Sequence, residues 1–453
     1  MSWLRKRLEI ANMNPKGQSL ATRYFWLSST QVSQAQIAST FVVLYLLDIV
    51  SWAELGLLLA IQFSLTALLD YPTGALADAI GHKRVLALAY TTYIFAILFL
   101  LAANSFIELL PWVVLASVGV SQESGALQAW FDNNYQVVAE DFDKDRAIYG
   151  AFRAKIQASF RLISGVLFVV GGLIAGVFSR RVLFLCQVCL VIIALMLIIF
   201  LMQNVEGVEI PPRTFKAYID RLKGGVTFFA SSRGTLFFFL GLACFGGVMT
   251  IWGGFMLFPL YESYAGADEA IGLLRSILFV TGFIWFMYVA RLSKKITKPH
   301  RPFFLAAFMV FIVFFGLVYG FYQLVPPPDR FDLSSFIALI ILFQWLGLWW
   351  SLNGILQSRL MIELVPNKYR NAVYSLIPTL VLLIGIPLVT LGGFVITHYG
   401  FSAGVLMILF FDLIAVTLLG LGLYWLAKAA AVEIQPSEGL PAPVQKPSAQ
   451  AAG

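Results

Sequence analysis

The sequence predicts an all-α membrane protein in which twelve transmembrane helices form two six-helix pseudo-repeats. Of its 453 residues, 60% are hydrophobic and only 12% are charged, whereas soluble domains average about 45–50% and about 25%. Apolar runs of about 20 residues, long enough to cross the hydrocarbon core of a bilayer, recur along the whole chain. A more polar stretch at 204–232 divides these runs six and six.

The predicted spans follow one another with short connections. They lie at residues 24–47, 54–79, 84–104, 108–133, 147–178, 182–203, 233–262, 269–292, 302–323, 333–361, 371–397 and 401–427. With the N-terminus in the cytoplasm, most of the 31 Lys and Arg residues fall in cytoplasmic segments, and only Arg180, Arg181 and Arg330 lie in external loops. This is the positive-inside bias. It predicts two cytoplasmic termini in a multi-pass protein of the cell membrane, and it explains the net charge of +7 without nucleic acid.

The remaining segments complete the predicted organisation. Residues 1–23 form a basic, amphipathic cytoplasmic N-terminus, and 24–203 form the N-terminal six-helix bundle. Residues 204–232 form a cytoplasmic loop with a short amphipathic helix, 233–427 form the C-terminal bundle, and 428–453 form a disordered tail rich in Pro, Ala and Ser. The three cysteines all lie in apolar runs, so no disulfide framework is expected.

The two halves share a short internal repeat. Arg146-Ala-Ile-Tyr149 opens the fifth span and Arg370-Asn-Ala-Val-Tyr374 opens the eleventh. Each is followed by a glycine pair, at 171–172 and at 392–393. Equivalent helices in two six-helix halves favour a parallel pseudo-repeat with a substrate site between the halves.

The stretch DYPTGALADAIGHKR at 70–84 marks the cytoplasmic exit of the second span. A glycine permits close helix approach, a second permits a sharp turn, and the basic residues hold that turn at the anionic inner leaflet. The stretch resembles motif A of the major facilitator superfamily, G-x-L-a-D-r-x-G-r-k. The matching residues are Gly74, Asp78, Gly81, His82, Lys83 and Arg84.

Further stretches are similar to other motifs of that superfamily. Asp70-Tyr-Pro-Thr-Gly74 and the stretch from Ser124 to Asp132, SGALQAWFD, resemble motifs of its multidrug and efflux branches, and residues 365–375 resemble its usual loop between helices ten and eleven. The fifth span lacks the Gly-Pro of the drug antiporters' motif C, so this resemblance does not extend to drug/proton exchange.

The resemblance implies a cytoplasmic gate that locks the outward-facing state. Asp78, Asp132 and a base on the motif A loop would form it, with Arg153 beside Asp132. His82 stands where motif A carries a base, so we hypothesise that this lock is pH-sensitive, because histidine titrates near neutrality. A His82→Arg variant whose conformational equilibrium matches wild type from about pH 5.5 to 8 would contradict this.

Charges within the spans indicate a coupling site, because charged side chains are costly in the bilayer and usually functional there. Helical rise places Glu123 at the depth of Arg161, and Asp132 at that of Arg153. We expect two ion pairs, which either couple protons to solute or serve as structural clasps. Asp70, Glu123 and Arg161 are the candidates for proton coupling. Glu262 and Arg275 are expected to form an external surface pair, with a gate as the alternative, and Asp412 is expected to bind a polar neighbour.

Polar and aromatic side chains on three spans predict the substrate cavity. The first span carries many amides and hydroxyls that lipid would penalise, so part of its surface should face water. The candidates are Gln31, Gln34, Gln157, Trp345, Trp349 and Asn353. The alternative is that the tryptophans are packing residues or interface anchors.

No enzyme motif accompanies these features. The sequence contains no Walker A, H-E-x-x-H or G-x-S-x-G pattern, and its three histidines are dispersed. We therefore expect no catalysis, no cofactor and no metal. The prediction is a monomeric secondary transporter that moves a small solute by alternating access. Transport is expected to be coupled to protons and to run in the direction of export. The expected partners are the solute, protons or another coupling ion, and membrane lipid. The alternatives are an uptake symporter and a transport-inactive sensor or scaffold.

Overall fold

The computed structural model describes residues 8–140, 142–143, 145–205, 223–292, 300–328 and 331–434. Residues 1–7, most of the predicted loop helix at 204–232 and the tail beyond 434 lie outside this description. Helices make up the described chain: η1 (Ile10–Asn12), α2 (Pro15–Gln36), α3 (Val42–Leu47), α4 (Trp52–Ile80), α5 (His82–Ala102), α6 (Phe106–Glu123), α7 (Ala126–Val138), α8 (Ala147–Val177), α9 (Arg180–Leu201), α11 (Arg233–Ile251), η2 (Trp252–Met256), α12 (Leu257–Ala265), α13 (Asp268–Leu292), α14 (His300–Leu324), α15 (Leu333–Leu364), α16 (Asn367–Tyr399) and α17 (Phe401–Ile434).

The described chain holds eleven helical segments that are long and apolar enough to cross a membrane. The predicted first span is not among them, since α2 carries a largely polar surface. With α2 and α3 counted as the first crossing, the structure has the twelve predicted crossings. The first helix begins at Pro15, within the segment predicted to be cytoplasmic, because Asn14 caps it by accepting a hydrogen bond from the Gly17 N–H at 2.7 Å.

Three of the predicted spans are broken helices rather than continuous ones. Between α2 and α3, the Ser39 hydroxyl donates to the Gln36 carbonyl at 2.9 Å and competes with the helical backbone bonds. Gly125, with φ of 68°, separates α6 from α7. A π-helical turn, Trp252–Met256, containing Gly253 and Gly254, joins α11 to α12. By length and hydropathy, Phe106–Val138 and Arg233–Ala265 each count as one span, so the hydropathy pattern does not reveal the second and third breaks.

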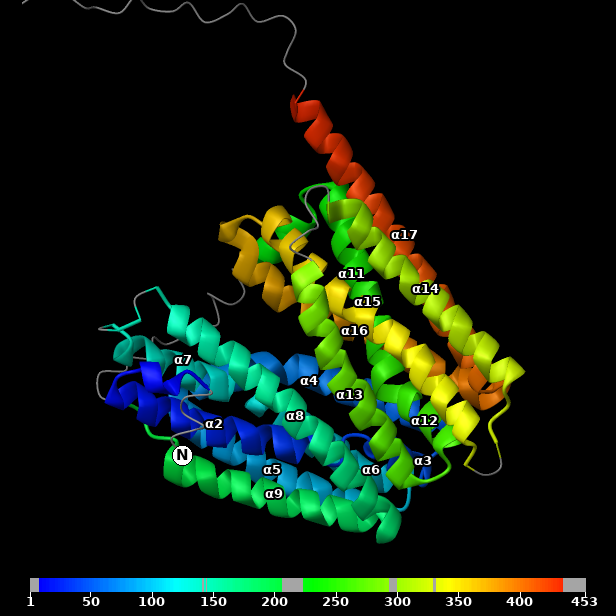
Figure 1. Cartoon of the computed structure of the whole chain (residues 1–453), viewed down its shortest axis with the longest axis horizontal. Helices are drawn as coiled ribbons and strands as arrows, with labels where there is room; N and C mark the ends of the chain where they lie inside the picture. The colour runs from blue at the N-terminus through cyan, green and yellow to red at the C-terminus, as the bar shows by residue number, and fades with distance from the viewer. Residues whose placement is uncertain are drawn as a thin grey trace, which may run out of the picture.

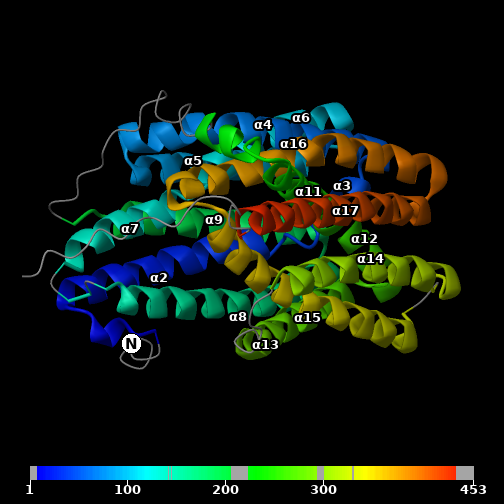
Figure 2. The ribbon, with the colours of Figure 1, turned by 90° about the horizontal axis from the view of Figure 1, so that it is seen from above.

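The twelve crossings form two halves, α2–α9 and α11–α17, which meet through two helix pairs. Helix α4 packs on α16, and α8 packs on α13; Figure 2 shows both pairs side by side. The halves come together where α3, α12 and the start of α13 lie, which we call the closed end. They diverge toward the end where α2 begins and α17 finishes, which we call the open end (Figure 1).

Paired glycines bring the two halves into backbone contact near the closed end. A Cβ at Gly272 of α13 would lie 2.4 Å from the Phe168 carbonyl oxygen and 2.8 Å from the Gly172 Cα of α8. On the other side, a Cβ at Gly393 of α16 would lie 2.4 Å from the Trp52 carbonyl oxygen of α4. The second glycine of each repeated pair thus occupies an equivalent crossing. The internal repeat seen in the sequence is therefore a repeat of the contacts between halves.

Candidate functional site

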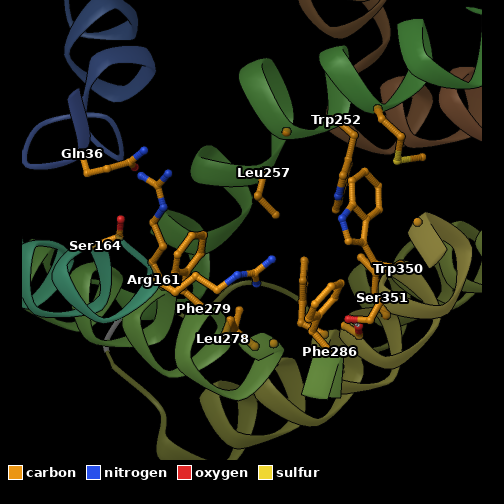
Figure 3. Close-up of a pocket in the computed structure, with 18 of the residues that line it drawn as sticks. Gln36, Arg161, Ser164, Trp252, Leu257, Leu278, Phe279, Phe286, Trp350 and Ser351 are labelled. Carbon is orange, nitrogen blue, oxygen red and sulfur yellow. Dashed lines mark hydrogen bonds between the residues drawn. The ribbon is translucent and has the colours of Figure 1, made fainter. Parts of the chain in front are cut away.

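A cavity of about 720 Å³ lies between the two halves. Helices α2 and α8 line it from the first half, and α11, the π-helical turn, α12, α13 and α15 line it from the second; Figure 3 shows side chains from both halves around it. Its volume lies within the range of about 300–1,000 Å³ that is typical of small-molecule sites. Much of its wall is aromatic: Phe160, Trp252, Phe258, Tyr261, Phe279, Phe286, Phe343 and Trp350.

The charged side chains of this cavity are all basic. Arg161 of α8 and Arg275 of α13 belong to its wall, and no Asp or Glu is among the described residues that line it. Gln36, Gln157, Ser164 and Ser351 add neutral polar groups. Two guanidinium groups thus lie in an otherwise uncharged, largely aromatic space between the halves.

Arg275 connects the second half to the break in the first helix. Its Nη1 donates to the Ser39 Oγ at 2.9 Å and to the Thr40 Oγ1 at 2.5 Å. The guanidinium carbon lies 3.9 Å from the ring centroid of Phe168 and 4.5 Å from that of Phe258. The expected pair of Arg275 with Glu262 is wrong, since Glu262 binds Arg180 instead.

Arg161 lies against aromatic rings of the opposite half. Its guanidinium carbon is 5.4 Å from the Phe286 ring centroid and 5.9 Å from that of Phe279. The expected Arg161–Glu123 ion pair is not formed in this conformation. The rise per residue of a helix predicts that the two residues lie at the same depth, but it does not predict the directions in which their side chains point. The Arg161 side chain points toward the second half.

Glu123, at the end of α6, is held entirely by neutral donors among the described residues. Its Oε1 accepts from Gln31 Nε2 at 2.8 Å, from the Tyr90 hydroxyl at 3.2 Å and from Gln34 Nε2 at 3.5 Å. Its Oε2 accepts from the Tyr93 hydroxyl at 2.7 Å. Gln31 and Gln34, predicted to line the cavity, therefore bind Glu123 from α2, while Val32 and Gln36 of the same helix line the cavity.

Two further acids within the spans differ in their surroundings. Asp70 on α4 is exposed, and its carboxylate makes no hydrogen bond or ion pair with the described residues. Asp412 on α17 is fully buried, and neither of its carboxylate oxygens has a hydrogen-bond partner among the described residues. The polar neighbour expected for Asp412 is therefore absent from the described part of the chain.

Asp132 and Arg153 lie near one another on α7 and α8, but each binds a tyrosine rather than the other. The Tyr149 hydroxyl donates to Asp132 Oδ1 at 2.7 Å. Arg153 donates to the Tyr24 hydroxyl and lies over the Tyr24 ring, with 5.6 Å between guanidinium carbon and centroid. The predicted direct pair is thus replaced by contacts through Tyr24 and Tyr149.

The motif A residues lie where α4 ends and α5 begins. Gly81, with φ of 92°, forms the predicted sharp turn. His82 is buried at the first position of α5, Arg84 is exposed, and Lys83 Nζ donates to the Ile199 carbonyl of α9 at 2.6 Å. Gly74 and Asp78 lie in α4, but the Asp78 side chain falls outside the described part of the structure, so the proposed lock on Asp78 is not seen.

The candidates on α15 do not line the cavity. The rings of Trp345 and Trp349 contact each other in a tilted arrangement, with 5.8 Å between ring centroids and 58° between planes, and Asn353 is buried. Trp350 and Ser351 line the cavity instead. Successive residues of a helix point in directions about 100° apart. An error of one position in the predicted face therefore selects the wrong side chains. Of the six residues predicted for the cavity, only Gln157 belongs to the wall, together with Arg161, which was predicted for proton coupling.

An ionic cluster fastens the closed end. Arg180, at the start of α9, binds Asp268 of α13 through Nε at 3.0 Å and Nη2 at 2.9 Å. It also binds Glu262 of α12 and, at 3.2 Å, Asp48 beyond α3. One arginine of the first half thus holds two carboxylates of the second. Among the described residues, no group of three or more His, Cys, Asp or Glu could hold a metal ion.

This architecture defines a class of protein: a helical membrane transporter with its site between two pseudo-repeated halves. The family model of the Major Facilitator Superfamily matches residues 26–389. The chain therefore belongs to the Major Facilitator Superfamily. A comparison with curated protein sequences found no match.

Solved structures of transporters share the fold. The nucleoside transporter NupG matches with a TM-score of 0.67 at 14% identity over 90% of this chain and 99% of its own. The POT family transporter PepTSo matches with a TM-score of 0.67 at 10% identity over 92% and 99%. A D-xylose-proton symporter matches with a TM-score of 0.60 at 12% identity over 90% and 96%. At these identities the likeness concerns the fold alone.

Proposed function

We propose that this protein is a proton-coupled secondary transporter that exports a small solute across the cell membrane by alternating access. The observation that carries the proposal is the cavity between two halves that are joined at one end and diverge at the other. A site enclosed by two rocking halves is what alternating access requires. The glycine crossings and the Arg180 cluster lie on the same side of that cavity, so that side can open only if they separate.

The charge distribution supports an orientation for this conformation. The positive-inside bias places the termini in the cytoplasm, and both described ends of the chain lie at the open end (Figure 1). The conformation is then inward-facing. The likeness of 70–74 and 124–132 to efflux-branch motifs supports export, with His82 and the other motif A residues at the cytoplasmic gate.

Glu123 is the first choice for the proton-coupling residue in this proposal. A carboxyl group in a polar but uncharged environment can alternate between protonated and ionised forms as its surroundings change. Gln31 and Gln34 bind it from α2, the helix whose neighbouring residues line the cavity. Movement of α2 on solute binding would therefore alter the environment of Glu123. Arg161 would sense the solute directly, and Asp70 is the second proton site to test.

Proton coupling is tested in proteoliposomes that enclose a pH-sensitive dye. They are challenged with pooled metabolites and amphipathic compounds under an imposed pH gradient. We expect solute-dependent proton flux in the wild type, with solute and proton moving in opposite directions. The flux should be lost in Glu123→Gln but kept in Glu108→Gln, a matched variant at the exposed end of the same helix. Asp70→Asn tests the second site.

The outcomes separate the alternatives. Solute and proton moving in the same direction would establish an uptake symporter. Tracer transport without any pH change would contradict proton coupling and make Glu123 a structural residue. Transport no faster than in empty liposomes for every pool would contradict the transport function and favour a sensor or scaffold.

A further inference from the structure

Resting on the proposed transport function, we propose that the central cavity binds an organic anion with an aromatic or apolar body. Its anionic group would bind Arg161 and Arg275, one from each half. Its body would pack against the aromatic wall. The inference thus names the chemical class of solute rather than the mode of transport.

The first argument is the unbalanced charge of the cavity. Arg161 and Arg275 carry two positive charges into a space whose described lining contains no carboxylate. Burying an uncompensated charge is costly. Elsewhere in this molecule, a partly buried arginine is compensated by carboxylates: Arg180 at the closed end binds carboxylates from three segments. The described residues give neither cavity arginine a carboxylate partner, and an anionic solute would supply one.

The second argument is the number of unused donors. A guanidinium group carries five N–H donors. Among the described residues, the Arg275 guanidinium uses only Nη1, for Ser39 and Thr40, and the Arg161 guanidinium makes no hydrogen bond. Phenylalanine rings contact both guanidinium groups: Phe168 and Phe258 lie beside Arg275, while Phe279 and Phe286 lie beside Arg161. Both groups are therefore positioned, yet free to donate to a carboxylate, phosphate or sulfonate oxygen.

The third argument concerns the rest of the solute. Trp252, Trp350 and Phe343 face the same space from the second half, as Figure 3 shows for the two tryptophans. Aromatic walls favour a flat or apolar body. They would equally attract a cation, but two guanidinium groups at the same site repel one. The combination selects an amphipathic anion over an amphipathic cation or a sugar.

The placement of the two arginines also ties binding to conformation. Arg161 belongs to α8 and Arg275 to α13, the pair of helices that crosses at Gly172 and Gly272. An anion held by both would bridge the halves. It would also compete with Ser39 and Thr40 for the Arg275 donors, and so act on the break between α2 and α3.

The test uses the purified full-length protein and isothermal titration calorimetry. The probes are 2-naphthoate, 2-naphthyl phosphate and 2-naphthalenesulfonate, with 2-naphthalenemethanol as the neutral analogue and 2-naphthylmethylamine as the cationic analogue. We expect saturable binding of at least one anion and at least tenfold weaker binding of the analogues. Arg161→Gln and Arg275→Gln should each weaken anion binding by about tenfold or more, since each removes a charge-assisted hydrogen bond.

Matched variants keep the result interpretable. Arg291→Gln removes the same charge from an exposed position near the end of α13 and should leave binding unchanged. Arg161→Lys and Arg275→Lys keep the charge but lose the fork geometry, so they should lie between wild type and the Gln variants. Size-exclusion profiles establish that each variant is folded.

Two outcomes would overturn the inference. One is binding of the neutral or cationic analogue as tight as that of the anions; the other is the absence of anion binding at millimolar probe. Because calorimetry does not require transport, the result is independent of the proposed function. Anion binding without transport would contradict the proposed transport function but not the anion site. Transport of a cation that persists in Arg275→Gln would contradict the anion site but not the transport function.

Discussion

Arg161, Arg180 and Arg275 differ in what surrounds their guanidinium groups. Arg180 binds carboxylates of both halves, whereas the other two lie among aromatic rings and hydroxyls. The sequence identifies Arg161 as a buried charge but gives Arg275 the wrong partner. Apart from Phe258 beside Arg275, their neighbours come from the other half of the chain, more than a hundred residues away, and a helical pattern carries no information about such contacts. Side-chain direction between halves is therefore what the sequence could not predict.

Asp143, in the loop before α8, offers a pH test at the scale of one residue. It accepts the Ile148 and Tyr149 N–H groups at 3.0 and 2.9 Å and the Tyr135 hydroxyl at 2.8 Å. Burial alone would raise the pKa of the Asp143 carboxyl, but these donors and Arg146 hold it below its ordinary value. Asp143→Asn should therefore lower the free energy of unfolding at pH 7 by about 1–2 kcal/mol.

The sign of the pH dependence follows from that depressed pKa. The carboxylate stabilises the fold above the pKa of the unfolded chain, about 4. Its contribution is lost as the pH falls through the lower pKa of the folded protein. The gap in melting temperature between wild type and Asp143→Asn should thus close below about pH 4, while exposed Asp145→Asn should show no gap. A gap of equal size at acid pH would contradict the assignment.

At the scale of elements, composition predicted the crossings but not their interruptions. The breaks after Gln36, at Gly125 and at Trp252–Met256 depend on backbone geometry, and the two spans that contain the last two breaks still read as continuous by length and hydropathy. The same limit applies to α15, where the choice between Trp349 and Trp350 decides which face meets the cavity. The repeated glycine pairs were the exception. Their spacing is visible in the sequence, and the structure gives it a physical meaning at the crossings.

The crossing of α8 and α13 can be tested by adding one carbon. In Gly272→Ala the new Cβ would lie 2.4 Å from the backbone oxygen of Phe168, and a backbone atom cannot rotate away. The closed end should loosen. A matched variant on the same helix, Gly282→Ala, has nothing within 4 Å of the added Cβ and gains about 1 kcal/mol of helix propensity.

The measurement is the distance between spin labels at Ile107 and Leu333, exposed positions where α6 and α15 begin, in a background without the three cysteines. Gly272→Ala should broaden and lengthen this distance distribution, and Gly282→Ala should leave it unchanged. A wild-type distribution in Gly272→Ala would show that the backbone contact does not hold the closed end.

At the scale of the whole molecule, the ionic cluster around Arg180 stabilises the conformation that is closed at this end relative to the one that is open there. Arg180→Gln removes the partner of Glu262 and Asp268 on the opposite half and leaves their charges repelling one another. Such a loss costs about 3–5 kcal/mol where the pair is buried and less where it is exposed. The population should shift toward molecules open at this end.

The same pair of labels reports on that shift, with the neighbouring residue as control. Arg181 is exposed and donates to Tyr45 of its own half at 3.3 Å, so Arg181→Gln should keep the wild-type distances. Arg180→Gln should add a longer population. If both variants leave the distribution unchanged, the cluster does not stabilise the closed end.

The glycine crossings also make each long helix a lever with unequal arms. From Gly172 to its start at Ala147, α8 extends about 38 Å at 1.5 Å per residue, whereas its other arm, toward Val177, is only about one and a half turns long. A tilt of about 10° around the crossing would carry the far tip through about 7 Å, close to the width of an aromatic solute. The short arm would move by little more than 1 Å. Hydrogen bonds at the closed end therefore control an aperture several times larger than their own displacement.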